Sequence, residues 1–289
     1  MPPLAIHEVP IQQFARCINL FLCRTDLSLE DVDRDDDLIT LHTNLAVRDG
    51  EATTVIIPDL CLDLQPPGGL SLPIWAMESG FSSTPVQMCS QLKAVADIVP
   101  ELDAAFLVSI HEAKYTPPPK SIPLYTLQPI PPSVFAPPTH TLSFGPVVVE
   151  GITWISINSV TFEASLRCED GQLRFGEGPL FAKGHLFPDL EMKGVDRLLD
   201  LAAQRFLQCV AEIMEGMPGV DASRVSQVRS TSQTAAFPTH WTKFLHKLQE
   251  AVWDTAYCQY HAWRYDNKPQ QDTPDLDPGP SSKHLAPSE

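Results

Sequence analysis

This sequence of 289 residues lacks the motifs that identify several large enzyme classes. It contains no Gly-x-x-x-x-Gly-Lys, no Gly-x-Gly-x-x-Gly, no His-Glu-x-x-His and no Gly-x-Ser-x-Gly. It also has no array of cysteine and histidine with the spacing of a zinc site. These absences remove phosphate-loop nucleotide hydrolases, dinucleotide enzymes, zincins and α/β-hydrolases as leading interpretations.

Long apolar runs and regularly spaced cysteines are missing as well. No apolar stretch approaches the ~20 residues of a membrane span, and the N-terminus has no basic region followed by a long apolar run. The seven cysteines, an odd number without a Cys-x-x-Cys pair, indicate buried free thiols in a reducing compartment. We therefore expect an intracellular protein, cytoplasmic or nuclear, with no membrane partner.

Positive charge is scarce in this chain. There are 20 Lys and Arg against 36 Asp and Glu, which gives a formal net charge of −16. A chain this acidic does not attract polyanions through its overall field, which argues against avid nonspecific binding of nucleic acid. Glycine is also sparse, at 14 residues against 28 prolines, and this predicts long irregular connections because proline interrupts both helices and strands.

The segment from Thr53 to Tyr115 has a regular pattern of predicted strands, a turn and a helix. Two apolar runs, TTVIIPDLCLDL and LPIWAMESGFSS, flank a Pro-Pro-Gly-Gly turn and predict a β-hairpin. A helix beginning at Thr84 and a strand over residues 104–110 are expected next. Each arm of the hairpin holds one carboxylate among apolar residues, Asp59 in the first and Glu78 in the second. Acids are rarely buried unless they are paired or bind a metal, so these two positions need an explanation.

Strand periodicity selects which acids can meet. Asp59 and Asp63 share one face of the first arm, but they are about 13 Å apart at a rise of about 3.3 Å per residue. One cation with oxygen bonds of about 2.0–2.6 Å does not span that gap. Asp59 and Glu78 lie on neighbouring strands and meet if the register brings them level. This pair is the predicted site.

The two motifs resemble those of a known superfamily. A Pro-Asp on one strand (Pro58-Asp59), then a glutamate motif on the next and a helix and strand after it, is similar to the PD-(D/E)XK or restriction endonuclease-like nucleases. The second motif, Glu78-Ser79-Gly80-Phe81-Ser82, resembles that of uncharacterised fungal members with Glu-x-Gly. The resemblance covers roughly residues 9–115.

The resemblance implies roles for particular residues. Asp59 and Glu78 would be catalytic and would bind Mg²⁺ or Mn²⁺ together with the Ser79 carbonyl, and the substrate would be DNA or RNA. In the superfamily the opening helix often adds an acid, for which Glu8 is the candidate. The family lysine, two residues after the glutamate, is Gly80 here, so the positive charge that stabilises the transition state is missing. Lys93 on the next helix is the predicted replacement, and Lys114 is the alternative.

We predict an α/β (α+β) fold with a mixed central sheet flanked by helices, a restriction endonuclease-like core, an added β-rich segment and C-terminal helices. The strands expected between Thr141 and Phe187 either extend the first sheet or form a second one. The predicted division is a nuclease-like core over residues 1–115, a Pro-rich linker over 116–140, a β-rich extension with an amphipathic helix over 141–218, a flexible loop over 219–238, an aromatic helix over 239–266 and a disordered acidic tail over 267–289.

Three functional interpretations follow from these features. The first is a metal-dependent phosphodiesterase. The second is a nuclease-fold protein without catalysis, which would bind a protein partner through the Pro-rich linker or the C-terminal helix. The third is a structural scaffold in which the two carboxylates pair with arginines. The missing lysine and the acidity favour the second, whereas the retention of two acids among apolar residues favours the first.

Overall fold

The chain folds around a mixed six-stranded sheet with the strand order β1-β4-β5-β6-β9-β10. The computed structural model describes residues 5–27, 38–44, 47–48, 55–66, 68–81, 85–113, 128–138 and 141–266. The helices of this part are α1 (Ala5–Arg24), α2 (Pro85–Ile98), η3 (Pro132–Phe135, a 3-10 helix), α3 (Lys193–Gly216), α4 (Ala222–Ser232) and α5 (Trp241–Asp266). The strands are β1 (Ile39–Thr43), β2 (Val47–Arg48), β3 (Val55–Ile56), β4 (Leu60–Leu64), β5 (Leu72–Phe81), β6 (Ala104–Glu112), β7 (Val147–Val149), β8 (Ile152–Ile155), β9 (Ile157–Leu166) and β10 (Phe181–Phe187).

The sheet is mixed because one connection inside it is a helical crossover. Strands β5 and β6 are parallel and are joined through α2, as parallel neighbours require. The other neighbouring pairs of this sheet are antiparallel. Residues 104–110 of β6 are all buried, as expected for a central strand with both faces covered.

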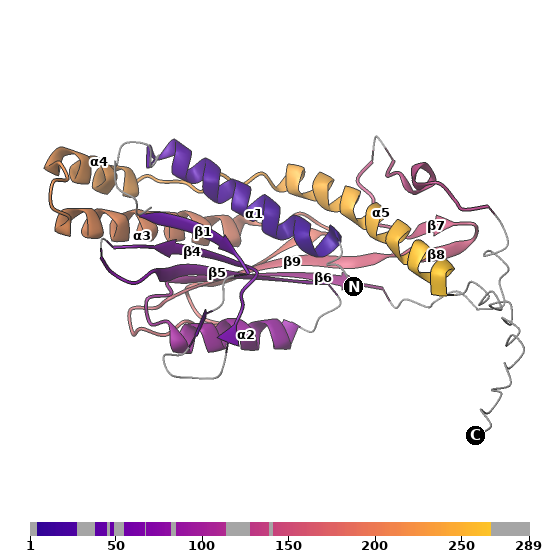
Figure 1. Cartoon of the computed structure of the whole chain (residues 1–289), viewed down its shortest axis with the longest axis horizontal. Coiled ribbons are helices and arrows are strands. Elements are labelled where there is room, and N and C mark those ends of the chain that lie inside the picture. The colour runs from indigo at the N-terminus through magenta and orange to yellow at the C-terminus, as the bar shows by residue number, and fades with distance from the viewer. Residues whose placement is uncertain are drawn as a thin grey trace, which may run out of the picture.

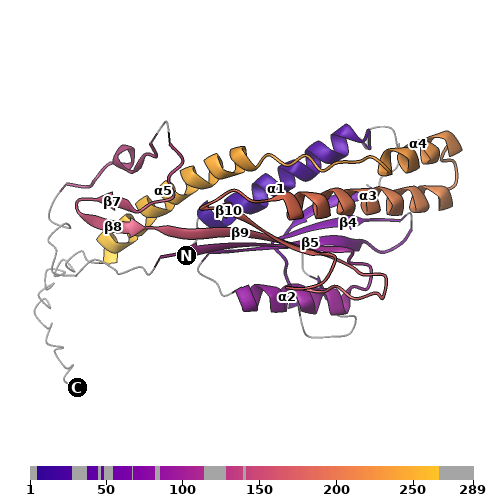
Figure 2. The same ribbon diagram turned by 180° about the vertical axis from the view of Figure 1, so that it is seen from behind.

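Helices cover the two faces of the sheet unequally. Helices α1 and α3 lie over one face, α5 runs beside α1, and α2 lies on the opposite face (Figures 1 and 2). The thicker layer holds the main core, in which aromatic rings meet with centroid distances between 4.8 and 6.2 Å. The rings belong to Phe14, Trp75, Phe106, Phe162 and Phe206. Tilted and edge-on contacts of this kind add to the free energy gained from burial.

The aromatic face of α5 packs inside the molecule. Trp154 of β8 contacts Tyr260 and Trp263 at centroid distances of 5.3 and 5.8 Å. Phe135 of η3 stacks on Tyr260, whose hydroxyl accepts a hydrogen bond from the Ile130 N–H at 2.9 Å. Part of the predicted Pro-rich linker is therefore packed against α5, and the aromatic stripe of this helix serves as a packing face.

The predicted α/β fold, with a mixed sheet and flanking helices, is confirmed. Strand β9 pairs with β6 and β10 pairs with β9, so these strands extend the first sheet, and the predicted core over 1–115 and the β-rich extension share one sheet. The predicted flexible loop over 219–238 is wrong, because α4 forms there. Asp221 caps that helix by accepting from the Ser223 N–H, and Val225 and Val228 are buried where α4 contacts α3.

Some predictions concern segments outside the described residues, namely most of the linker over 116–140, Lys114 and the tail over 267–289. Within the described ranges, no helix combines the length and apolar character that crossing a membrane requires. The seven cysteines are free thiols.

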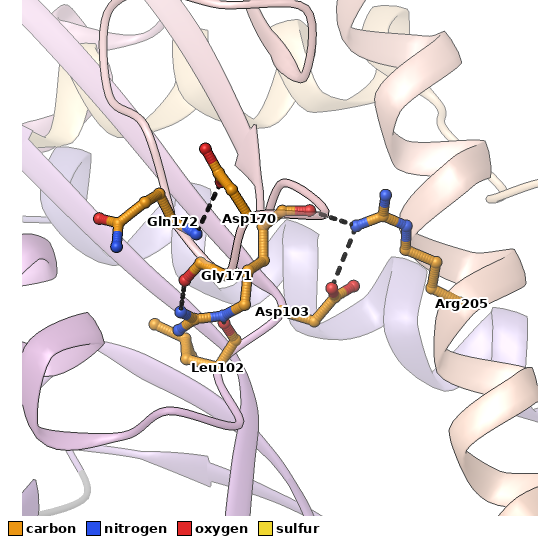
Figure 3. A network of polar contacts seen from close by, with 7 residues as sticks. Leu102, Asp103, Asp170, Gly171, Gln172 and Arg205 are labelled. Carbon is orange, nitrogen blue, oxygen red and sulfur yellow. Dashed lines mark hydrogen bonds and ion pairs between the residues drawn. The ribbon is translucent and has the colours of Figure 1, made fainter.

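A polar network joins the turn after α2, the hairpin after β9 and helix α3 (Figure 3). Arg205 Nη1 of α3 lies 3.2 Å from Asp103 Oδ1 and donates to the Arg167 carbonyl at 2.7 Å. Arg167 in turn donates to the carbonyls of Leu102 and Gly171. Two guanidinium groups thus satisfy backbone acceptors and one carboxylate at the base of β6, where three segments far apart in sequence meet.

Candidate functional site

The register of β4 and β5 places the two predicted acids side by side. Leu60 pairs with Met77, so the residue before Leu60, Asp59, stands level with Glu78. Leu60 and Met77 belong to the core under α1 and α3, whereas Ala76 belongs to the core under α2. Because side chains alternate along a strand, Glu78 points to the α2 side, as Ala76 does. The Asp59 carboxyl lies near it, so the two carboxyls affect each other's pKa.

This carboxyl pair is nearly closed off from solvent. The Asp59 side chain is 13% exposed, and Glu78 is 5% exposed. Asp59 Oδ2 accepts a hydrogen bond from the Ser79 N–H at 2.7 Å. Glu78 Oε1 is buried and has no hydrogen-bond partner among the described residues. An unpartnered buried carboxyl oxygen is costly, so its position indicates a site that is completed by another group.

Burial and mutual repulsion control the ionisation of the pair. Burial raises the pKa of Glu78 to about 8, and the neighbouring Asp59 charge adds to this effect. Burial also raises the pKa of Asp59, although the Ser79 N–H and His7 lower it in part. Like charges this close do not both ionise readily, so near neutral pH the pair retains one proton, held on Glu78.

The Ser79 backbone contributes to the same place. Within a strand, the N–H and C=O of one residue face the same neighbouring strand, since paired residues exchange both bonds. The Ser79 N–H reaches Asp59, so its carbonyl also faces the β4 side, beyond Leu60 where the β4 ladder begins. The predicted third ligand is therefore beside the two carboxyls.

Helix α1 brings two more titratable groups to the pair. His7 Nε2 lies 3.5 Å from Asp59 Oδ2, and His7 Nδ1 lies 3.4 Å from Glu8 Oε1. The Ser79 hydroxyl donates to the His7 carbonyl at 3.3 Å, which fixes the start of α1 against β5. Glu8, the predicted additional acid, thus lies beside the site, and its charge contributes to the raised pKa of Asp59. Sequence reasoning missed His7, although its position next to Glu8 in the first turn of the helix was a usable signal.

Lys93 contacts an aromatic ring and not the carboxyl pair. It is exposed on α2, and its Nζ lies 5.9 Å from the ring centroid of Phe175, over which it makes a cation–π contact. None of the contacts recorded for the described residues joins Lys93 to Asp59 or Glu78. The predicted replacement for the family lysine is therefore not brought to the carboxyl pair.

The chemistry of the donors fits a hard divalent cation. Carboxylate and carbonyl oxygens are the ligands that Mg²⁺ and Mn²⁺ prefer, and Glu78 Oε1 is free of other partners in the described structure. In the described ranges, no group of three or more His, Cys, Asp or Glu is arranged to hold a metal. Protein atoms would thus fill only part of a coordination shell, which is usual for Mg²⁺ because this ion keeps several waters.

Comparisons with protein-family models, with curated proteins and with solved structures give no match to this chain.

Proposed function

We propose that this chain is a restriction endonuclease-like protein in which Asp59 and Glu78 bind Mg²⁺ or Mn²⁺ for hydrolysis of phosphodiester bonds in DNA or RNA. The observation that carries the proposal is the meeting of two buried carboxyls from adjacent strands, with one oxygen left unpartnered. The order of elements also supports it, because α1, β1, β4, β5, α2 and β6 follow the helix, strands, helix and strand that the resemblance implies. We also propose that the protein is intracellular.

Several residues of the chain would hold the ion or orient its ligands at this site. Asp59 and Glu78 hold the ion with the Ser79 carbonyl, and the Ser79 N–H orients Asp59. Binding of a cation requires Glu78 to release its proton, since its carboxyl is protonated near neutral pH. When bound, such an ion polarises a phosphoryl oxygen and lowers the pKa of a bound water.

His7 is the group proposed to replace the family lysine. In its protonated form it would place a positive charge beside Asp59, at the side of the pair opposite to β6. Glycine at position 80 leaves the neighbouring space without a side chain.

Thermal unfolding in the presence of Mg²⁺ or Mn²⁺ tests the ion site directly. A ligand present at about 10 to 100 times its Kd stabilises the folded chain by about 1.4 to 2.7 kcal/mol. For a chain of this size we expect the Tm to rise by about 2 to 6 °C. Asp59→Asn and Glu78→Gln should abolish the rise, whereas Glu215→Gln, an exposed acid on α3, should retain it.

Catalysis requires a second measurement. Labelled single-stranded and double-stranded DNA and RNA would be incubated with the wild-type chain and Mn²⁺, with Asp59→Asn as the matched inactive variant. Cleavage by the wild type alone would support the enzyme. Stabilisation by the ion without cleavage would retain the ion site and reject the phosphodiesterase.

A second candidate function is a nuclease-fold protein without catalysis that binds a protein partner. Gly80 in place of lysine, the direction of Lys93 and the net charge of −16 favour it. The aromatic face of α5 packs internally, so the Pro-rich segment is the better surface for such a partner. Absence of both the Tm rise and cleavage would select this candidate.

A further inference from the structure

A second buried acid, Asp63, lines a cavity of about 620 Å³ on the α2 side of the sheet. The cavity lies at the far end of β4 from Asp59, between strand β1 and the end of α2. Its described lining consists of Thr40, His42, Val47, Asp63, Gln65, Leu70, Ser71, Leu72, Pro73, Ile98, Val99 and Glu101. A volume of this size lies in the range of small-molecule sites, about 300–1,000 Å³.

An irregularity in the sheet shapes this cavity. Leu62 pairs with Trp75 but Asp63 pairs with Pro73, so Ile74 is the extra residue of a β-bulge. Bulges bend the strand and redirect side chains, and they are common beside functional sites. Strand β1 is the edge of the sheet, and its Thr40 stands opposite Asp63. The cavity therefore opens at the side of the sheet.

Asp63 is only partly satisfied in this place. Its residue is 1% exposed, and its Oδ2 accepts a hydrogen bond from the Ser71 hydroxyl at 2.8 Å, while His42 Nε2 lies 3.9 Å away. Its Oδ1 is buried and has no hydrogen-bond partner among the residues the structure describes. Burial raises the pKa of the Asp63 carboxyl, whereas Ser71 and His42 lower it. A carboxylate oxygen left in this state is destabilising unless a donor reaches it.

The lining decides which ligand could supply that donor. An ionised carboxylate only accepts hydrogen bonds, so the ligand must donate. Among the described lining residues there is no lysine or arginine, and Glu101 adds a second acid at the rim. Leu72, Ile98 and Val99 provide apolar walls for a hydrocarbon chain. A cation with an apolar body matches both features, and an anion matches neither.

We propose that this cavity binds a small organic cation whose ammonium group donates to Asp63 and whose apolar chain lies along the end of α2. Ser71 is exposed, so its side chain can move aside as the ammonium group enters. The site is separate from the Asp59–Glu78 pair and rests on its own observations, so it stands whether or not that pair binds a metal.

Isothermal titration of the full chain tests this with n-hexylamine, 1-hexanol and hexanoate, which share one hydrocarbon length and differ in charge. We expect saturable binding of the amine and at least about tenfold weaker binding of the alcohol and the acid, the usual effect of a charged hydrogen bond. Asp63→Asn should weaken amine binding by about 10- to 100-fold. Asp254→Asn, an exposed acid on α5, is the matched control and should bind the amine as the wild type does.

Circular dichroism of each variant shows whether it folds. If Asp63→Asn does not, Ile98→Phe replaces it, because a larger side chain at the end of α2 fills the cavity without touching the carboxylate; amine binding should then be lost. N-acetyl-lysine amide offers the same ammonium on a peptide unit, and its affinity relative to the amine assigns the source as a free amine or a lysine side chain. No saturable binding of either, equal binding of amine and alcohol, or unchanged binding by a folded Asp63→Asn variant would overturn the proposal.

Discussion

Two polar clusters of the described structure place buried carboxyls beside different groups: one holds the single carboxyl of Asp103, and the other holds the carboxyls of Asp59 and Glu78. At the base of β6, Asp103 faces the guanidinium of Arg205, and Arg167 satisfies the carbonyls around it (Figure 3). At the other end of β5, Asp59 and Glu78 face each other, and the His7 Nε2 atom lies 3.5 Å from Asp59 Oδ2.

A carboxyl paired with an arginine stabilises the fold, whereas two carboxyls that face each other are suited to binding. The arginine cluster pairs Asp103 with a guanidinium and joins α3, the hairpin and the α2–β6 turn, although Asp103 Oδ2 is buried without a hydrogen-bond partner among the described residues. The carboxyl pair instead keeps a proton where a cation could lie. Each cluster leaves one buried carboxyl oxygen unpartnered among the described residues, so the Asp59–Glu78 pair is distinguished by two adjacent carboxyls that no guanidinium of the described residues contacts, which makes it the better candidate for binding a cation.

Removing the Arg205 guanidinium from the cluster at the base of β6 should have the largest effect. In Arg205→Met, Asp103 remains largely buried, at 19% side-chain exposure, without its counter-ion. Breaking a buried pair typically costs 3 to 5 kcal/mol, and partial exposure here lowers the expected loss to about 3 kcal/mol. Urea unfolding followed by circular dichroism measures it.

The control for this variant is an exposed ion pair between α4 and α3. Arg229 and Glu215 lie 2.8 Å apart, with side chains 51% and 63% exposed. Arg229→Met should cost less than about 1 kcal/mol because solvent screens the pair. Equal losses for the two variants would show that the network of Figure 3 does not hold the fold.

The carboxyl pair should make the free energy of unfolding depend on pH. The pKa of Glu78 is about 8 in the folded chain against 4.5 for the free group. Between these values the folded chain holds a proton that the unfolded chain has released, so stability falls as pH rises through this window. We expect Glu78 to contribute a loss of about 2 kcal/mol between about pH 5.5 and pH 7.5.

The contribution is isolated by comparing variants over the same pH range. Glu78→Gln keeps the shape of a protonated carboxyl and should remove this part of the pH dependence. Glu215→Gln, on the surface, should leave it intact. An identical pH profile for the wild type and Glu78→Gln would mean that the pair ionises freely and is not the proton-holding site inferred from its burial.

Local patterns were sufficient to predict much of this arrangement. Alternation along two strands and a turn between them identified Asp59 and Glu78 as a pair that would meet only if the register placed them level, and the pairing of Leu60 with Met77 is that register. The sequence also predicted a helix beginning at Thr84, and α2 runs over Pro85–Ile98 with Met88, Leu92 and Val95 buried. These features depend on neighbours a few residues apart, where strand and helix periods determine direction.

Contacts between distant segments were not predictable in the same way. His7 and Ser79 are separated by 72 positions, and nothing local indicates that α1 begins beside β5. The sequence of α4 is polar with only Val225, Val228 and Ser232 buried, so its helical state depends on packing against α3. Lys93 lies off the apolar stripe of α2, and its contact with Phe175 depends on the hairpin after β9.

The smallest expected effect concerns His7, and it sharpens the contrast between the two clusters. His7 is 31% exposed and 3.5 Å from Asp59, so His7→Gln should change the free energy of unfolding by less than about 1 kcal/mol. Its loss removes a group that lowers the pKa of Asp59, so the decline of stability with pH should move to slightly higher pH. The measurement is the pH profile used for Glu78, with His246→Gln on the exposed side of α5 as the control.

A loss of stability in His7→Gln comparable to that of Arg205→Met would make His7 a structural counter-ion. In that case the carboxyl pair would already have a structural counter-ion, as Asp103 has in Arg205. The proposal that the pair binds a cation from outside the chain would then fail.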